Sequence, residues 1–160
     1  MLVRRLMTGL VGGLLTGGVV AADYPTFLRD YPDLLPEKTL VLISGDGERQ
    51  ELTVRELSLK DHRRRGMKGL EPEVVRNNPM LFVFSGASTT TWDTQDVAIP
   101  IVVGFIAEDG RVVATTRMGP DADGEGVDQP IRYVLQIAPG RAASIELDAG
   151  TRFEDLPRNE

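Results

Sequence analysis

The sequence predicts one mainly β domain (α+β class): a small antiparallel, barrel-like sheet of about seven short strands with one short helix. Its 160 residues suit a single compact domain, and 41% hydrophobic against 26% charged residues is the balance of a globular protein. A content of Gly 17 and Pro 10 favours many turns and short strands. The apolar runs show no repeating strand–helix–strand rhythm, so a mainly parallel sheet is not expected.

The first residues have the layout of a secretory signal peptide. Arg4 and Arg5 precede an uncharged apolar stretch over residues 6–20, and Ala22 completes a small-residue cleavage site. A stretch of about fifteen apolar residues with several glycines falls short of the ~20 that a spanning helix needs. We therefore expect residues 1–22 to be removed. The mature protein would then be periplasmic or secreted, without a membrane span.

Residues 23–38 contain three prolines and no clear period, which is typical of an extended leader or linker, one that can lie against the domain. The β-rich, barrel-like domain is expected over residues 39–154, and residues 155–160 form a C-terminal tail. The stretch "TLVLIS" (39–44) predicts the first strand, and "GDGE" (45–48) predicts the turn that follows it.

The second apolar run, "QELTVREL" (50–57), predicts another strand. Leu52 and Val54 lie on one face of that strand, but Leu57 follows Val54 after an odd number of residues and would point to the other face. Since alternate residues of a strand point to opposite faces, we expect either a bulge near Arg55 or a strand that ends there.

A short helix is expected from about Leu59 to Met67. Ser58 and Asp61 have the S-x-x-D spacing of a capping box, in which each side chain satisfies a backbone N–H at the start of a helix. Gly69 can end this helix in a left-handed conformation.

The second half of the chain predicts five further strands. "MLFVF" (80–84) has the composition of a buried strand, and residues 99–117 place two apolar runs around Asp109-Gly110, which suits a tight hairpin turn. After a polar loop, residues 131–137 alternate as in a half-buried strand. The residues expected to point inward are Ile131, Tyr133, Leu135 and Ile137. "APGRAAS" suits a turn and one helical turn, and "TRF" (151–153) a last short strand.

The composition excludes several kinds of function. A net charge of −6 repels phosphate backbones, so nucleic acid is not an expected partner. With no cysteine, the chain has no disulfide, no catalytic thiol and no cysteine-ligated metal. His62 is the only histidine, so a zinc site with several histidines is excluded and a Ser-His-Asp triad has one possible base.

Three stretches in this order resemble the domain of unknown function 192 family, and together they cover roughly residues 39–154. They are "RRRGMKGL" with "NNPMLFVF", then "TTWDTQDVAIPIVVGFIAEDGRVV", then "RYVLQIAPGRA". The resemblance implies a small β-rich, barrel-like fold with a short helix, often exported, and no established activity.

The chain departs from the family pattern next to its only tryptophan. The pattern usually reads tryptophan, methionine, a basic residue, asparagine and threonine, followed by proline, leucine and aspartate. Trp92 and Pro100 match this pattern, whereas the run Asp93–Asp96 and Val102 do not. The resemblance therefore implies that any polar site common to the family is altered here.

The Trp92 segment is the main candidate site, and three interpretations stay open. The indole can cover the end of the barrel, with its N–H bonded to a backbone carbonyl. It can instead form one wall of a shallow pocket for a sugar or small polar ligand, or belong to a protein-docking patch. Arg65 either lies on a solvated helix face or forks onto a carboxylate near this segment. The candidate ligand-binding residues are Trp92, Asp93, Gln95, Asp96, Arg65 and Tyr133.

Asp93 and Asp96 also suggest glycoside hydrolysis, which needs two carboxyl groups ~5 to 9.5 Å apart. A spacing of three residues reaches that range, but so does any acidic surface loop.

The stretch "DADGEG" (121–126) resembles the start of a calcium-binding loop, with Asp121, Asp123 and Glu125 as candidate ligands. Arg132 stands where such a loop has its bidentate glutamate, so a solvated loop is the alternative. Calcium is the only cofactor that the sequence suggests.

These observations predict an exported monomer with a non-catalytic role. It would bind a small polar or carbohydrate ligand, or serve as an accessory to an envelope protein. The competing hypothesis is a hydrolase that acts on a glycan through Asp93 and Asp96.

Overall fold

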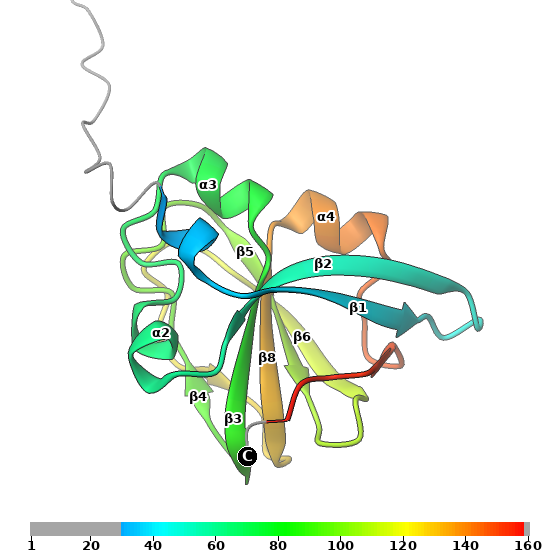
Figure 1. Ribbon diagram of the computed structural model, residues 1–160. Helices are drawn as coiled ribbons and strands as arrows, with labels where there is room; N and C mark the ends of the chain where they lie inside the picture. The colour runs from blue at the N-terminus through cyan, green and yellow to red at the C-terminus, as the bar shows by residue number, and fades with distance from the viewer. Residues whose placement is uncertain (1–29, 159–160) are drawn as a thin grey trace, which may run out of the picture.

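The computed structural model describes residues 30–158 and confirms the mainly β fold (Figure 1). The predicted signal peptide, residues 23–29 of the leader and residues 159–160 of the tail lie outside the described residues. The strands are β1 Glu37–Ile43, β2 Arg49–Leu57, β3 Met80–Ser88, β4 Thr91–Trp92, β5 Ile101–Ile106, β6 Val112–Met118, β7 Glu125–Gly126, β8 Ile131–Ile137 and β9 Arg152–Glu154. The helical segments are a 3-10 turn η1 Tyr31–Leu34, α2 Lys60–Arg65, α3 Pro72–Asn77 and α4 Pro139–Ser144.

Seven strands form one curled sheet, a half-barrel, in the order β6-β5-β8-β3-β2-β1-β9. Every neighbouring pair is antiparallel except β2 and β3, which are parallel. The two edges of the sheet approach each other where Arg111 bridges to Arg152. At this point the Phe153 N–H donates to the Gly110 carbonyl at 2.8 Å. A separate two-stranded ribbon pairs β4 with β7.

The sheet buries side chains on both of its faces. One core cluster, here called the strand cluster, takes residues from all seven strands of the sheet, including Leu40, Leu81 and Tyr133. The other, here called the helix cluster, includes Met67 and Val75 from the α2–α3 region. Strand β3 contributes to both clusters, since alternate side chains along it point to opposite faces. That is why "MLFVF" is apolar without interruption.

The packed domain begins earlier than the sequence suggests. Tyr31 and Leu35 lie in the residues predicted to be an extended leader, but both are buried in the helix cluster. Residues Tyr31–Leu34 form η1, with Pro32 near its start. Proline is favoured there because its missing N–H has no partner in the first turn of a helix.

The predicted capping box is wrong. Helix α2 begins at Lys60 with Leu59 as its N-cap residue and no side-chain cap. The Ser58 hydroxyl instead donates to the Glu56 carboxylate, which removes it from the helix end. Gly66, with φ +51°, ends the helix one turn before Gly69. Helix α3 is an additional helix that the sequence analysis did not predict.

Strand β2 neither bulges nor ends at Arg55. It changes neighbour there: Arg55 is the last residue paired with β1 and the first paired with β3. Leu52 and Val54 therefore pack in the strand cluster and Leu57 in the helix cluster, which accounts for the change of parity. Strand β8 also differs from the half-buried prediction, because Val134 is buried on its other face.

Within residues 30–158, no helix has the length and apolar character that crossing a bilayer requires.

Candidate functional site

Trp92 packs against aromatic neighbours of the helix cluster. Its ring meets Phe82 edge-on, with ring centres 4.7 Å apart and planes at 84°, and meets Phe84 edge-on at 6.4 Å. Such T-shaped pairs are favourable because the edge of one ring carries the charge opposite to the face of the other. The indole N–H is buried. Within the described residues it has no acceptor, so the hydrogen bond to a backbone carbonyl, expected if the indole covers the end of the barrel, is not formed.

Thr94 joins the Trp92 loop (residues 92–97) to the acidic loop (residues 119–126). Its side chain is buried, and its hydroxyl donates to the Gly119 carbonyl at 2.6 Å and accepts from the Ala122 N–H at 2.9 Å. Its backbone N–H and carbonyl pair with Ala122 and Asp121. Thr94 was not among the predicted site residues, because a threonine among polar residues gives no sign of burial.

Gln95 and Asp96 complete the junction between these two loops. The Gln95 amide donates to the Asp123 carboxylate at 2.9 Å, and the Asp96 N–H donates to the Asp121 carboxylate at 2.8 Å. Two of the candidate calcium ligands thus accept hydrogen bonds from the candidate ligand-binding segment. The third, Glu125, pairs in register with Trp92. Calcium binding in this loop stays a prediction.

Asp93 and Asp96 are both exposed. Asp93 accepts from the Gln95 N–H at 3.1 Å and lies 3.9 Å from the Lys68 ammonium. A carboxyl group that acts as a general acid in glycoside hydrolysis usually sits in an apolar pocket, which keeps it protonated. The surroundings of these two side chains do not favour the hydrolase hypothesis.

Arg65 faces Tyr31. Its guanidinium carbon lies 4.5 Å from the centre of the Tyr31 ring, a cation–π contact. Burial raises the pKa of the Tyr31 phenol, and the charge of Arg65 acts in the opposite direction. Arg63, not Arg65, lies beside the aromatic rings that pack around Trp92. Its guanidinium carbon is 5.2 Å from the centre of the Phe84 ring, and its guanidinium donates to the Val83 carbonyl at 3.0 Å.

Tyr133 belongs to the strand cluster and so lies apart from Trp92, which packs on the helix cluster. It lines a cavity of about 590 Å³, here called the end cavity, where β9 approaches the β5–β6 turn. The lining residues are Glu108, Asp109, Gly110, Tyr133, Arg152, Phe153, Glu154, Asp155, Leu156 and Arg158.

The lining of the end cavity combines aromatic rings with charges of both signs. Burial raises the pKa of the Tyr133 phenol, while Arg132 and Arg158 act in the opposite direction. The phenol is therefore a neutral hydroxyl near pH 7, able to donate and accept hydrogen bonds. Arg132 forms an ion pair with Glu108. Apart from Tyr133, the lining residues of the end cavity were not predicted as site residues, because they come from separate segments that the bridge between the sheet edges brings together.

Comparisons with known proteins agree with this fold. A family model described as DUF192, uncharacterized ACR, matches residues 41–154. A crystal structure from Sinorhizobium meliloti 1021, described as a candidate transcription regulator, is similar with a TM-score of 0.68 and 22% identity, over 75% of this chain and 94% of that one. A protein of unknown function from Novosphingobium aromaticivorans DSM 12444 gives a TM-score of 0.65 and 20% identity, over 75% and 86%. At these identities the likeness shows the fold alone. No curated protein matches the chain.

Proposed function

The chain belongs to the DUF192 family, a family of unknown function, and from this premise we propose that it is an exported, non-catalytic binding module for a small polar ligand such as a sugar. The end cavity is the observation that carries this proposal. Its volume of about 590 Å³ lies within the ~300–1,000 Å³ range of small-molecule sites, and ligands often bind at the mouths of barrels.

The chemistry of the cavity suits a ligand rich in hydroxyl groups. Tyr133 and Phe153 line the cavity although each is only 2% exposed, and the surrounding carboxylates and guanidinium groups supply acceptors and donors. Because the lining carries both signs of charge, a neutral polar ligand satisfies it without leaving a large excess of either charge. Asp93 and Asp96, the pair of the competing hydrolase hypothesis, do not line this cavity.

Export is the first part of the proposal to test. In a cell that secretes proteins through the same kind of signal, the recovered protein is expected to begin at Asp23, as measured by N-terminal sequencing and intact mass. Replacing Ala22 with a bulky residue, Ala22→Leu, should leave the precursor uncut, because the cleavage site requires small residues. Recovery of uncut chain from the cytoplasm alone would contradict export.

Ligand binding is the second part to test. Titration of the isotope-labelled protein with glucose, N-acetylglucosamine and maltose is expected to shift amide NMR signals of residues 108–110 and 152–156 for at least one sugar. Tyr133→Phe should weaken that binding about fivefold, because a hydrogen bond contributes about 1 kcal/mol. Asp155→Asn is a suitable second variant, since asparagine tolerates the positive φ of 55° found at this position.

The control for both variants is Arg64→Gln, which removes an exposed charge from α2, outside the cavity lining. It should bind the same sugar as the unmodified protein does. If none of the three sugars shifts the cavity signals, or if Tyr133→Phe and Arg64→Gln bind equally, the cavity is not the ligand site.

A further inference from the structure

We propose a second binding site, for a small amphipathic organic anion, in a groove between α3, β6 and α4. This groove, here called the arginine groove, has a volume of about 470 Å³. Its lining residues are Arg76, Ile99, Pro100, Arg117, Ala138, Pro139, Gly140 and Arg141. The ligand class is an oxyanion, a carboxylate or a phosphate, attached to a short apolar group.

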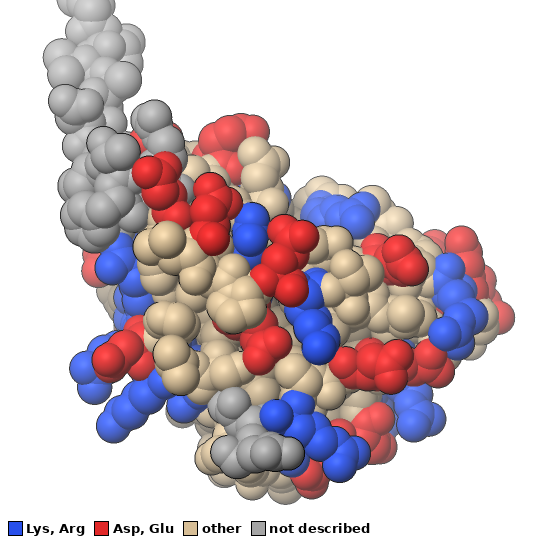
Figure 2. All heavy atoms as spheres, in the orientation of Figure 1, with Lys and Arg blue, Asp and Glu red and all other residues tan. Residues whose placement is uncertain are grey.

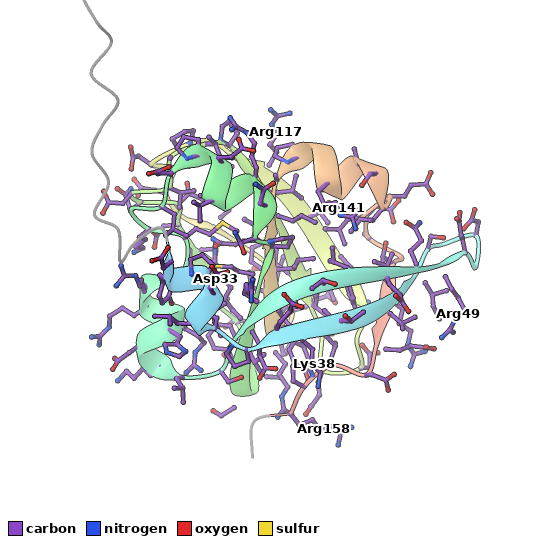
Figure 3. All side chains as sticks on the ribbon, turned by 45° about the horizontal axis from the view of Figure 1, so that its top comes forward. Asp33, Lys38, Arg49, Arg117, Arg141 and Arg158 are labelled. Atoms are coloured by element: carbon purple, nitrogen blue, oxygen red, sulfur yellow. The ribbon has the colours of Figure 1, made fainter. Side chains whose placement is uncertain are left out.

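Three guanidinium groups from three different elements line this one groove. Arg76 lies on α3, Arg117 on β6 and Arg141 on α4, and Figure 3 labels Arg117 and Arg141 on the same side of the molecule. On the face shown in Figure 2, acidic and basic side chains are interspersed. Because like charges repel, a groove lined by three cations gains most from an anion placed among them.

The three arginines are not committed to strong interactions within the protein. Arg76 pairs with Glu73 at 2.9 Å, but both side chains are more than half exposed, and such surface pairs contribute little. Among the described residues, Arg141 donates only to the neutral Ser144 hydroxyl, at 3.3 Å. Within residues 30–158, Arg117 has no ion pair, and its cross-strand neighbour is the apolar Val102.

The rest of the lining selects for an anion that carries an apolar group. Ile99, Pro100, Ala138 and Pro139 present hydrocarbon surface beside the guanidinium groups. A guanidinium can donate two parallel hydrogen bonds to a carboxylate or phosphate, while the apolar strip accepts a short alkyl chain. A long polyanion is a poor fit, because the chain as a whole carries a net charge of −6 and repels it.

This site is independent of the proposed function. Arg158, which lines the end cavity, lies on the opposite side of the molecule from Arg117 and Arg141 in Figure 3. The two cavities share no lining residue.

The test is a calorimetric and NMR titration with four probes: octanoate, octyl phosphate, inorganic phosphate and the neutral octanol. Octanoate or octyl phosphate, or both, should bind and shift amide signals of Arg117 and residues 138–141, and comparing them identifies the preferred oxyanion. Inorganic phosphate should bind at least tenfold more weakly, because it makes no apolar contact, and octanol should not bind measurably.

Arg117→Gln is the decisive variant, and it should weaken binding of the better probe about tenfold. Arg117→Lys should give an intermediate loss, since lysine keeps the charge but not the fork of donors. Arg141→Gln serves as a second variant from another element, and Arg64→Gln, again from α2, is the matched control. The proposal is overturned if neither octyl anion binds, if octanol binds as well as they do, or if Arg117→Gln binds as tightly as Arg64→Gln.

Discussion

Gly110→Ala is expected to lower the free energy of unfolding by about 2 to 4 kcal/mol. A β-carbon at this position would lie 2.2 Å from the Phe153 carbonyl oxygen, and the backbone φ is +88°. The obstructing atom belongs to the backbone of β9, so no side-chain rotation relieves the overlap. Either the hydrogen bond from the Phe153 N–H to the Gly110 carbonyl breaks or β9 shifts away from the β5–β6 turn.

Urea unfolding followed by far-ultraviolet circular dichroism measures this loss. Gly45→Ala is the matched control, because Gly45 lies in the β1–β2 turn, where an added β-carbon meets nothing within 4 Å. That variant should stay within about 0.5 kcal/mol of the unmodified protein. Equal stabilities of the two variants would mean that the contact between β9 and the β5–β6 turn adds little. The end cavity, which depends on that contact, would then lack a rigid wall.

Local patterns in the sequence predicted the parts of the fold that local physics determines. The hairpin turn at Asp109-Gly110 forms where the sequence places it, because glycine supplies the positive φ that the turn requires. The strands expected at 80–84 and 131–137 are present, since their apolar content reflects burial. The mainly β class follows from several such segments together.

The features that the sequence analysis missed depend on partners far away in the chain. The parallel pairing of β2 with β3 has no local signal, and neither does the burial of Tyr31 and Leu35 within the helix cluster. The predicted capping box does not form, because the Ser58 hydroxyl donates to the Glu56 carboxylate, whose charge makes it a strong acceptor.

The candidate site was predicted from neighbouring residues in the sequence, namely Trp92, Gln95 and Asp96. In the structure Gln95 and Asp96 donate to the acidic loop, whereas the Trp92 ring packs on the helix cluster. The sequence did not identify their partner loop as a structural neighbour, because hydrogen bonds across 25 to 28 residues leave no spacing to recognise. Arg117 was likewise missed, since the arginines of its groove are dispersed along the chain.

Replacing the indole itself should separate packing from hydrogen bonding. Trp92→Ala is expected to cost about 3 kcal/mol of unfolding free energy, because it empties the space against Phe82 and Phe84. Trp92→Phe keeps a ring in that space and removes the buried N–H that lacks a partner within the described residues. Since a buried unpaired donor costs about 1–3 kcal/mol, its removal offsets the smaller ring, and the net loss should stay below about 1 kcal/mol.

The two variants together decide among the interpretations of the Trp92 loop. A large loss for alanine with a small loss for phenylalanine means that the residue acts as an aromatic cover over the helix cluster, where ring shape matters and the N–H does not. Equal losses in urea unfolding would contradict that reading. They would require the N–H to make a hydrogen bond in solution, and the Trp92 loop would then be the place to search for a bound group.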